Sequence, residues 1–189
     1  MTDIFPSDLP EFPNRVAANQ RRLLENLRSS YDFIVCGAGS AGSVVARRLA
    51  ENPSVEVLLI EAGGRDDYAW IHIPVGYLYC IGNPRTDWLY KTEPDAGLNG
   101  RRLRYPRGKT LGGSSSINGH IYNRGQRQDF DTWAQQGNRG WGYPDILPYF
   151  KRWERRIGEG AETYRGRDGS LTVTTMDGND PLCEAFMEG

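Results

Sequence analysis

The spacing of apolar residues changes twice early in the chain. Residues 31–36 (YDFIVC) form an apolar run of strand length, and the glycine-rich stretch GAGSAG interrupts it. Apolar residues then return at helical spacing, and Ala41, Val45 and Leu49 fall four apart, which predicts that these side chains face a sheet. Residues 55–60 (VEVLLI) are rich in branched side chains and too few for a typical helix. The pattern predicts a strand, a helix and a second, parallel strand.

The other patterns along the chain are weaker. Residues 71–94 are aromatic and interrupted by prolines, which indicates a loop-rich segment. Residues 146–156 predict a helix with Asp145 near its start, and the alternation in residues 170–176 (SLTVTTM) predicts a strand. Residues 14–29 predict an amphipathic helix, and we favour packing on its own domain over partner binding.

Aromatic residues are concentrated in the second half of the chain. A stacking surface for bases or sugars and a buried core are the two alternatives, and the core is favoured because aromatic rings usually bury their area. The residues concerned are Trp133, Trp141, Tyr143, Tyr149, Phe150 and Trp153.

Composition limits the class of protein. The chain has 189 residues, 38% of them hydrophobic and 25% charged, with a net charge of -1, as expected for a globular protein with a real core. Five of the nine residues from Arg101 to Lys109 are basic, but the balanced total charge favours a local anion site over a nucleic-acid surface. The first thirty residues contain no apolar run typical of a signal peptide or a membrane span.

The cysteines match neither a metal site nor a disulfide framework. Cys36, Cys80 and Cys183 are odd in number and widely spaced, so we expect reduced, buried thiols. The sequence also has no Asn-x-Ser/Thr sequon. Both features favour a cytoplasmic location.

A glycine-rich turn between the first strand and the helix carries the clearest chemistry. Gly37, Gly39 and Gly42 form G-x-G-x-x-G: the first glycine permits a tight turn, the second lets backbone approach a pyrophosphate, and the third lets helix and strand pack closely. The N-terminus of the helix adds free N–H groups and the positive end of its dipole. We therefore include Ser40 and Ala41 among the phosphate contacts.

An acidic residue ends the second strand. Glu61 follows Gly42 at about the 20-residue spacing of dinucleotide-binding folds. Its carboxylate can accept hydrogen bonds from ribose hydroxyls and disfavours a 2′-phosphate, and Ala62 lies beside it. A glycine turn used only for packing is the alternative, but the complete unit favours an adenine dinucleotide, either FAD or NAD.

A second glycine-rich segment spans residues 107–125 (RGKTLGGSSSINGHIYNRG). Gly112 and Gly113 can expose backbone N–H groups to an anion, and the hydroxyls of residues 114–116 can add donors. Such a site suits a pyrophosphate or the edge of a flavin. Arg107 and Lys109 either add positive potential or lie on a solvated surface.

From residue 31 onward, the sequence resembles the glucose/methanol/choline (GMC) oxidoreductase family of flavoproteins, especially its choline and medium-chain alcohol dehydrogenase branch. From Gly108 to Asp131, residue types and spacing match the first signature motif of that family. The resemblance implies an α/β, Rossmann-like FAD-binding fold. The segments that carry it are YDFIVCGAGSAGSVVARRLA, LLIEAGG, DWLYKTEP, LNGRRLRYPRGKTLGGSSSINGHIYNRG, GWGYPDILPYFKRWE and YRGRDGSLTV.

The resemblance and the two glycine segments together imply one FAD site, covered by residues 71–94. Some relatives attach FAD through a histidine where this chain has Ile117, so noncovalent FAD is implied. The resemblance places residues 118–121 near the reactive face of the flavin. The expected cofactor contacts are Gly37, Gly39, Ser40, Ala41, Gly42, Glu61, Ala62, Arg107, Gly108, Leu111, Gly112, Gly113, Ser114, Asn118, Gly119, His120 and Ile121.

The chemistry that the resemblance implies is oxidation of the CH–OH group of a small-molecule alcohol, with hydride transfer to flavin N5; the electron acceptor is not assigned. The catalytic histidine of the family has no counterpart here, and for His72 and His120 we expect structural hydrogen bonds. We therefore assign no catalytic residue and expect inactivity without a C-terminal half. A non-catalytic FAD-binding module or an inert fragment is the alternative, and an NAD-dependent enzyme is disfavoured.

The sequence divides into an N-terminal extension, residues 1–30, and the N-terminal part of an FAD-binding domain, residues 31–189, with the substrate domain absent. Two parallel strands cannot bury a doubly wound core, so we expect an incomplete sheet. Open sheet edges and apolar faces then predict self-association.

Overall fold

The computed structural model describes residues 18, 21–175 and 181–188, and the chain forms two compact units, Met1–Ile121 and Tyr122–Gly189. Among the described residues, no helix is long and apolar enough to cross a bilayer. The first unit contains, in chain order, β1 (Phe33–Cys36), α2 (Ser40–Leu49), β2 (Val57–Ile60), η1 (Ala69–His72), η2 (Pro74–Gly76), α3 (Tyr77–Cys80), η3 (Ala96–Leu98) and η4 (Gly113–Ser116). The second contains α4 (Arg127–Gln135), α5 (Tyr143–Trp153), β3 (Glu154–Arg156), β4 (Leu171–Val173) and α6 (Pro181–Glu188).

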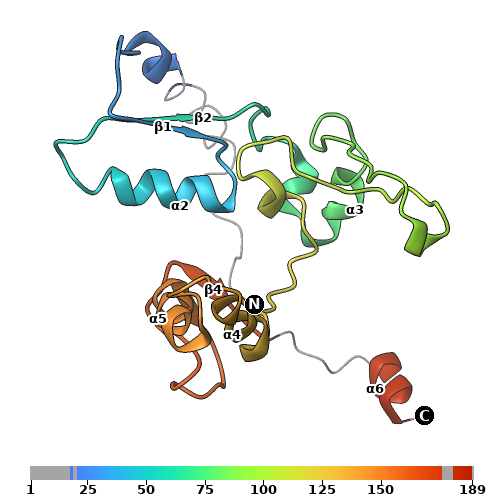
Figure 1. Cartoon of the computed structure of the whole chain (residues 1–189). Coiled ribbons are helices and arrows are strands. Elements are labelled where there is room, and N and C mark those ends of the chain that lie inside the picture. The colour runs from blue at the N-terminus through green and yellow to red at the C-terminus, as the bar shows by residue number, and fades with distance from the viewer. Residues whose placement is uncertain (1–17, 19–20, 176–180, 189) are drawn as a thin grey trace. The chain divides into compact units, whose positions relative to one another are not determined.

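The strand–helix–strand prediction is confirmed. Strands β1 and β2 are parallel, with Phe33 opposite Val57 and Cys36 opposite Ile60, and α2 runs alongside them (Figure 1). In the described part of the first unit these two strands form a sheet of their own. The fold is an incomplete Rossmann-like α/β arrangement, as expected.

The face of α2 that meets the sheet differs from the prediction. Ala41 and Val45 are exposed, whereas Ala46 is buried and Leu49 is half-buried. A methyl group at Gly42 would lie 1.8 Å from the carbonyl oxygen of Gly37 and 3.4 Å from a methyl of Val35. The helix therefore turns its glycine toward β1, because only a residue without a side chain permits this approach.

The sheet leaves much of its apolar surface exposed. Phe33 and Ile34 of β1, Leu59 and Ile60 of β2 and Val44 of α2 are all exposed. These are the side chains that a complete doubly wound fold would bury between its layers.

In the second unit, the predicted 146–156 helix is wrong at both ends. Helix α5 begins at Tyr143, with a proline in its first turn, and ends at Trp153; Glu154 starts β3, which pairs in parallel with β4. Glu154 is fully buried and accepts hydrogen bonds from Arg124, Arg165 and the backbone N–H of Gly166. This buried ion-pair network fixes Glu154 in an extended segment, so the helix stops before it.

The expectation of an aromatic core is only partly confirmed. Phe130 contacts Trp133, Tyr143 and Phe150, with ring centroids 5.4–6.4 Å apart. Tyr143 is buried, but Trp133, Trp141, Tyr149 and Trp153 stay exposed.

Two further expectations have mixed outcomes. Cys80 is a buried free thiol as expected, but Cys36 is an exposed one; the side chain of Cys183 lies outside the described structure. Residues 21–25 of the predicted N-terminal helix are helical, with exposed leucines, and most of residues 14–20 lie outside the described residues.

The exposed sheet predicts self-association. We expect the 189-residue chain to sediment as species larger than a monomer at micromolar concentration, because Ile34, 60% exposed on β1, would leave water by pairing with another copy. Ile34→Thr should raise the monomer fraction in sedimentation velocity. Leu78→Thr on α3, matched at 59% exposure, should leave it unchanged. A monomeric wild-type chain that unfolds cooperatively would contradict this prediction.

Candidate functional site: two glycine turns around one pocket

Two glycine turns that lie far apart in the sequence meet in the structure. Gly39 and Gly112 form a parallel β-bridge, and the backbone N–H of Gly112 donates to the carbonyl of Ala38 at 2.9 Å. A methyl group at Gly113 would lie 2.9 Å from the Cα of Gly39. The backbones touch here because neither turn carries a side chain at the contact.

The backbone at these turns needs glycine for a second reason. Gly37, Gly112 and Gly113 have φ values of 99°, 89° and 57°, which lie in the region that side chains disfavour. Helix α2 begins directly after Gly39, and no side chain caps its first turn. Its first N–H groups are therefore available to an anion, with the positive end of the helix dipole behind them.

Glu61 ties the first glycine turn to the end of β2. One carboxylate oxygen accepts a hydrogen bond from the backbone N–H of Ala38 at 2.7 Å, and the other accepts from Gly63 at 2.8 Å. Each oxygen has a second lone pair, so the carboxylate can still accept from ribose hydroxyls. The residue therefore braces the site as well as offering acceptors to a ligand.

The segment after Glu61 packs against the second glycine turn. The Thr110 hydroxyl is buried and lies 3.2 and 3.1 Å from the carbonyl oxygens of Gly64 and Arg65. A methyl group at Gly63 would lie 2.1 Å from the carbonyl carbon of Lys109. Three separate chain segments are thus held together by backbone contacts.

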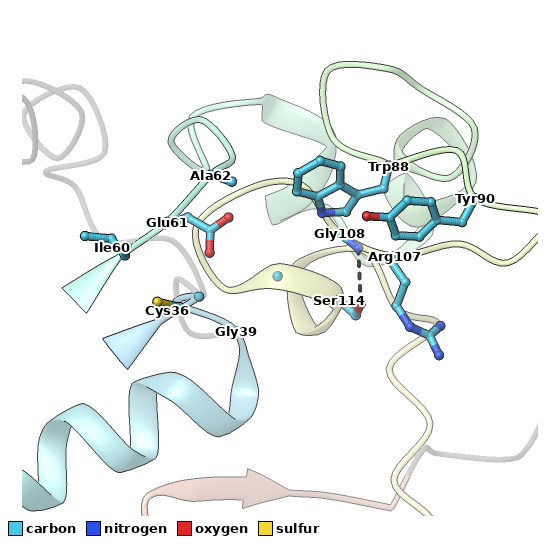
Figure 2. Close-up of a pocket in the computed structure, with 12 residues that line it drawn as sticks. Cys36, Gly39, Ile60, Glu61, Ala62, Trp88, Tyr90, Arg107, Gly108 and Ser114 are labelled. Carbon is cyan, nitrogen blue, oxygen red and sulfur yellow. Dashed lines mark hydrogen bonds between the residues drawn. The ribbon is translucent and has the colours of Figure 1, made fainter. Parts of the chain in front are cut away.

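A pocket of about 410 Å³ opens where these segments meet, a size typical of small-molecule sites (Figure 2). Arg107 lines this pocket, and its guanidinium lies 3.9 Å from the Tyr105 ring centroid and donates to the carbonyl of Pro106 at 2.7 Å. The predicted contacts that line the pocket are Gly37, Gly39, Glu61, Ala62, Arg107, Gly108, Gly113 and Ser114.

The remaining predicted contacts lie outside the pocket lining, and their contact with a cofactor stays a prediction. Ile121, for example, is 89% exposed, whereas Ile117, four residues earlier, is buried. The residues outside the lining are Ser40, Ala41, Gly42, Leu111, Gly112, Asn118, Gly119, His120 and Ile121.

The serine hydroxyls of the second turn serve mainly the turn itself. Ser115 and Ser116 donate to the carbonyls of Gly112 and Leu111 at 2.6 and 2.8 Å. The Ser114 hydroxyl accepts from the N–H of Gly108 at 3.1 Å (Figure 2), which leaves its own O–H free to donate. Of the three expected hydroxyl donors, Ser114 is the one that lines the pocket.

The two histidines lie outside this pocket. The Nε2 atom of His72 donates to the carbonyl of Asp66, as expected for a structural histidine. His120 adopts φ 60°, and its backbone N–H donates to the Asn118 side chain at 2.9 Å.

Four pocket residues were missed by the sequence analysis: Cys36, Ile60, Trp88 and Tyr90. Cys36 and Ile60 are the last residues of adjacent parallel strands, so their place follows from the strand prediction. Trp88 and Tyr90 belong to the aromatic segment expected to cover the cofactor. The sequence did not indicate which residues of that segment contact it.

Asp87 anchors this aromatic segment. Burial raises the pKa of its carboxyl, but N–H donors from Gly82, Leu89 and Arg107 outweigh burial and hold the pKa below its ordinary value. The charged form of Asp87 therefore holds the backbone of Leu89, next to Trp88, and that of Arg107 on the adjacent segment.

The arrangement fits a dinucleotide. The N–H groups at the start of α2 suit a pyrophosphate, and Glu61 suits an adjoining ribose. The N–H groups of Gly112 and Gly113, which the sequence led us to expect as anion donors, instead donate to the carbonyls of Ala38 and Thr110 at 2.9 and 2.8 Å. The described residues contain no cluster of side chains that could hold a metal ion. Fold and site together define the nucleotide-binding part of a dinucleotide-binding protein.

Comparison with known proteins identifies the family. The sequence model of the GMC oxidoreductase family matches residues 31–189, and the chain belongs to this family. The family and the flavoenzymes among its structural neighbours imply FAD as the cofactor.

The relatives named here are much longer than this chain. Oxygen-dependent choline dehydrogenases of Photobacterium profundum and Vibrio vulnificus are 46% and 48% identical over 166 residues, which cover 86% of this chain and 29% of each relative. Pyridoxine 4-oxidase from Mesorbium loti superposes with a TM-score of 0.75 at 38% identity, over 84% of this chain and 31% of that one. Formate oxidase of Aspergillus oryzae gives 0.72 at 32% identity, over 83% and 29%. The chain therefore spans less than a third of these relatives.

Two glycines of the first turn should respond oppositely to substitution. A methyl group at Gly39 meets only ordinary contacts of 3.8 Å within the protein, so Gly39→Ala should change the unfolding free energy by less than about 1 kcal/mol. It should still weaken FAD binding about tenfold, because the methyl group enters the pyrophosphate space. Gly42→Ala should destabilise the fold by about 3 kcal/mol or more. Urea unfolding and FAD titration measure both effects, and an unchanged FAD affinity in Gly39→Ala would contradict the assignment.

The lowered pKa of Asp87 predicts that this residue contributes to the free energy of unfolding in a pH-dependent way. Because its pKa is lowered on folding, the contribution is complete above the ordinary value of 3.8 and is lost as pH falls through the lower folded-state value. Asp87→Asn should cost about 1–3 kcal/mol at pH 7. The gap between wild type and variant should narrow below about pH 4 in urea unfolding. A gap that stays constant from pH 7 to pH 3 would rule out the charged carboxylate as its source.

Proposed function

We propose that this chain forms the FAD-binding portion of an oxidoreductase that oxidises the CH–OH group of a small alcohol. The observation that carries the proposal is the contact between Gly39 and the Gly112–Gly113 turn at one pocket. It places the N–H groups at the start of α2 and the acceptor Glu61 beside the backbone of the second turn, as a dinucleotide requires. When bound, FAD supplies the hydride-accepting N5 position of its flavin.

The chain's own contribution is binding and orientation. The N–H groups at the start of α2 hold the pyrophosphate beside Gly39 and Gly113, Glu61 orients a ribose, and Arg107 adds positive potential at the edge of the pocket. We assign no proton-accepting residue within the described structure. Alcohol oxidation therefore depends on segments of the longer relatives that lie outside the part matched here.

For the substrate we propose a small primary alcohol, with choline as the first candidate. The support comes from the oxygen-dependent choline dehydrogenases, which are 46–48% identical to this chain. The electron acceptor is not assigned. The cytoplasmic location expected from the sequence stays a prediction.

Flavin retention tests the proposed function. The purified 189-residue chain, incubated with FAD and desalted, should show flavin absorbance bands, whereas incubation with NAD should leave no bound nucleotide. Acid precipitation should release FAD into the supernatant, because Ile117 offers no atom for a covalent bond. Flavin that stays with the precipitate would contradict noncovalent binding, and absence of retained FAD would contradict the proposal itself.

Dye reduction tests the reaction. With a panel of primary alcohols that includes choline, we expect the FAD-loaded chain to leave the dye unreduced, because it carries no assigned base. Reduction by this chain would contradict the dependence on further segments and would support catalysis within its own residues.

A further inference from the structure

A second pocket is formed by residues of the second unit alone and shares no lining residue with the first. Its volume is about 550 Å³, within the range typical of small-molecule sites. Thr163, in the loop between β3 and β4, forms one part of its wall. Helices α4 and α5 contribute the rest, namely Arg127, Tyr143, Pro144, Leu147, Pro148 and Lys151.

One face of α5 forms most of this pocket. Four of its lining residues follow the spacing i, i+3, i+4 and i+7, which places them along one side of the helix. They are Pro144, Leu147, Pro148 and Lys151. The first three are apolar, and the last is a cation in the final turn. The pocket therefore offers a ligand an apolar wall that ends in an ammonium group.

Two cations line the pocket with no carboxylate to balance them. Within the described part of the chain, Arg127 and Lys151 form no ion pair, and the pocket lining contains no acidic residue. In the same unit, by contrast, Arg124 and Arg165 are both paired with Glu154. The pocket therefore carries two positive charges that a ligand can neutralise.

Tyr143 holds one of these cations in place. Its side chain is buried, and the guanidinium carbon of Arg127 lies 4.9 Å from its ring centroid, a cation–π distance. A guanidinium that stacks on a ring keeps its N–H groups at its edge, where they can donate. Burial and the neighbouring Tyr164 raise the pKa of Tyr143, so its hydroxyl stays neutral and adds no negative charge to the pocket.

An apolar wall with two cations beside it fits one class of ligand. We propose that this pocket binds a small organic carboxylate. Its carboxylate group meets Arg127 and Lys151, and its apolar body packs on the prolines and the leucine of α5. The planar fork of an arginine matches the two oxygens of a carboxylate, and a lysine adds a point charge. An inorganic anion would leave the apolar wall in water, and an uncharged ligand would leave both cations unpaired.

Three small probes test this inference on the 189-residue chain. Saturation-transfer NMR titration should detect binding of benzoate, and benzamide, which has nearly the same shape without the charge, should bind at least about fivefold more weakly. Inorganic phosphate should displace benzoate only about tenfold less effectively than unlabelled benzoate does, because it has no apolar body. Absence of benzoate binding, benzamide that binds as tightly, or phosphate that competes equally well would each overturn the proposal.

Variants locate the binding. Arg127→Gln and Lys151→Gln keep most of each side chain and remove its charge, so each should weaken benzoate binding about fivefold. Arg152→Gln is the matched control, because Arg152 follows Lys151 in the last turn of α5 but does not line the pocket, and it should leave the affinity unchanged. Urea unfolding checks that each variant is folded. Unchanged affinity in the first two variants, or an equal loss in all three, would overturn the site.

Discussion

The close approach of two glycine backbones is the contact on which the rest of the site depends. Gly39 and the Gly112–Gly113 turn can come together because Gly113 has no side chain. A side chain there would collide with the chain opposite. That contact brings the N-terminus of α2 next to a second set of backbone groups. The side chains of Glu61 and Thr110 then tie the neighbouring segments to it through hydrogen bonds to backbone groups.

Local patterns predicted the parts of the fold that local physics controls. The strand–helix–strand unit follows from a change in hydrophobic period, and the first glycine turn follows from its place between strand and helix. The face of α2 was not predictable from periodicity, because the contact of Gly42 with Gly37 outweighs the apolar stripe of Ala41 and Val45. The end of α5 depends on the buried pair of Glu154 and Arg124, whose partners lie 30 residues apart.

The positions of Trp88 and Tyr90 in the pocket were not predictable from the sequence for the same reason. Trp88 reaches the pocket through hydrogen bonds to the 104–108 segment and a left-handed Leu89, neither of which a residue pattern encodes. Conversely, the signature motif predicted Asn118 to Ile121 as flavin contacts, and these residues lie outside the pocket lining. The chain spans 29% of the choline dehydrogenases it resembles, and the apolar face of its sheet is open.

The central claim is that both glycine turns contact one FAD molecule. Hydrogen–deuterium exchange of the 189-residue chain, with and without FAD, tests it most directly. We expect exchange to slow together in residues 37–42 and 111–115 when FAD binds, with residues 127–135 in the second unit unaffected. Protection of only one turn, or of neither, would contradict a shared site.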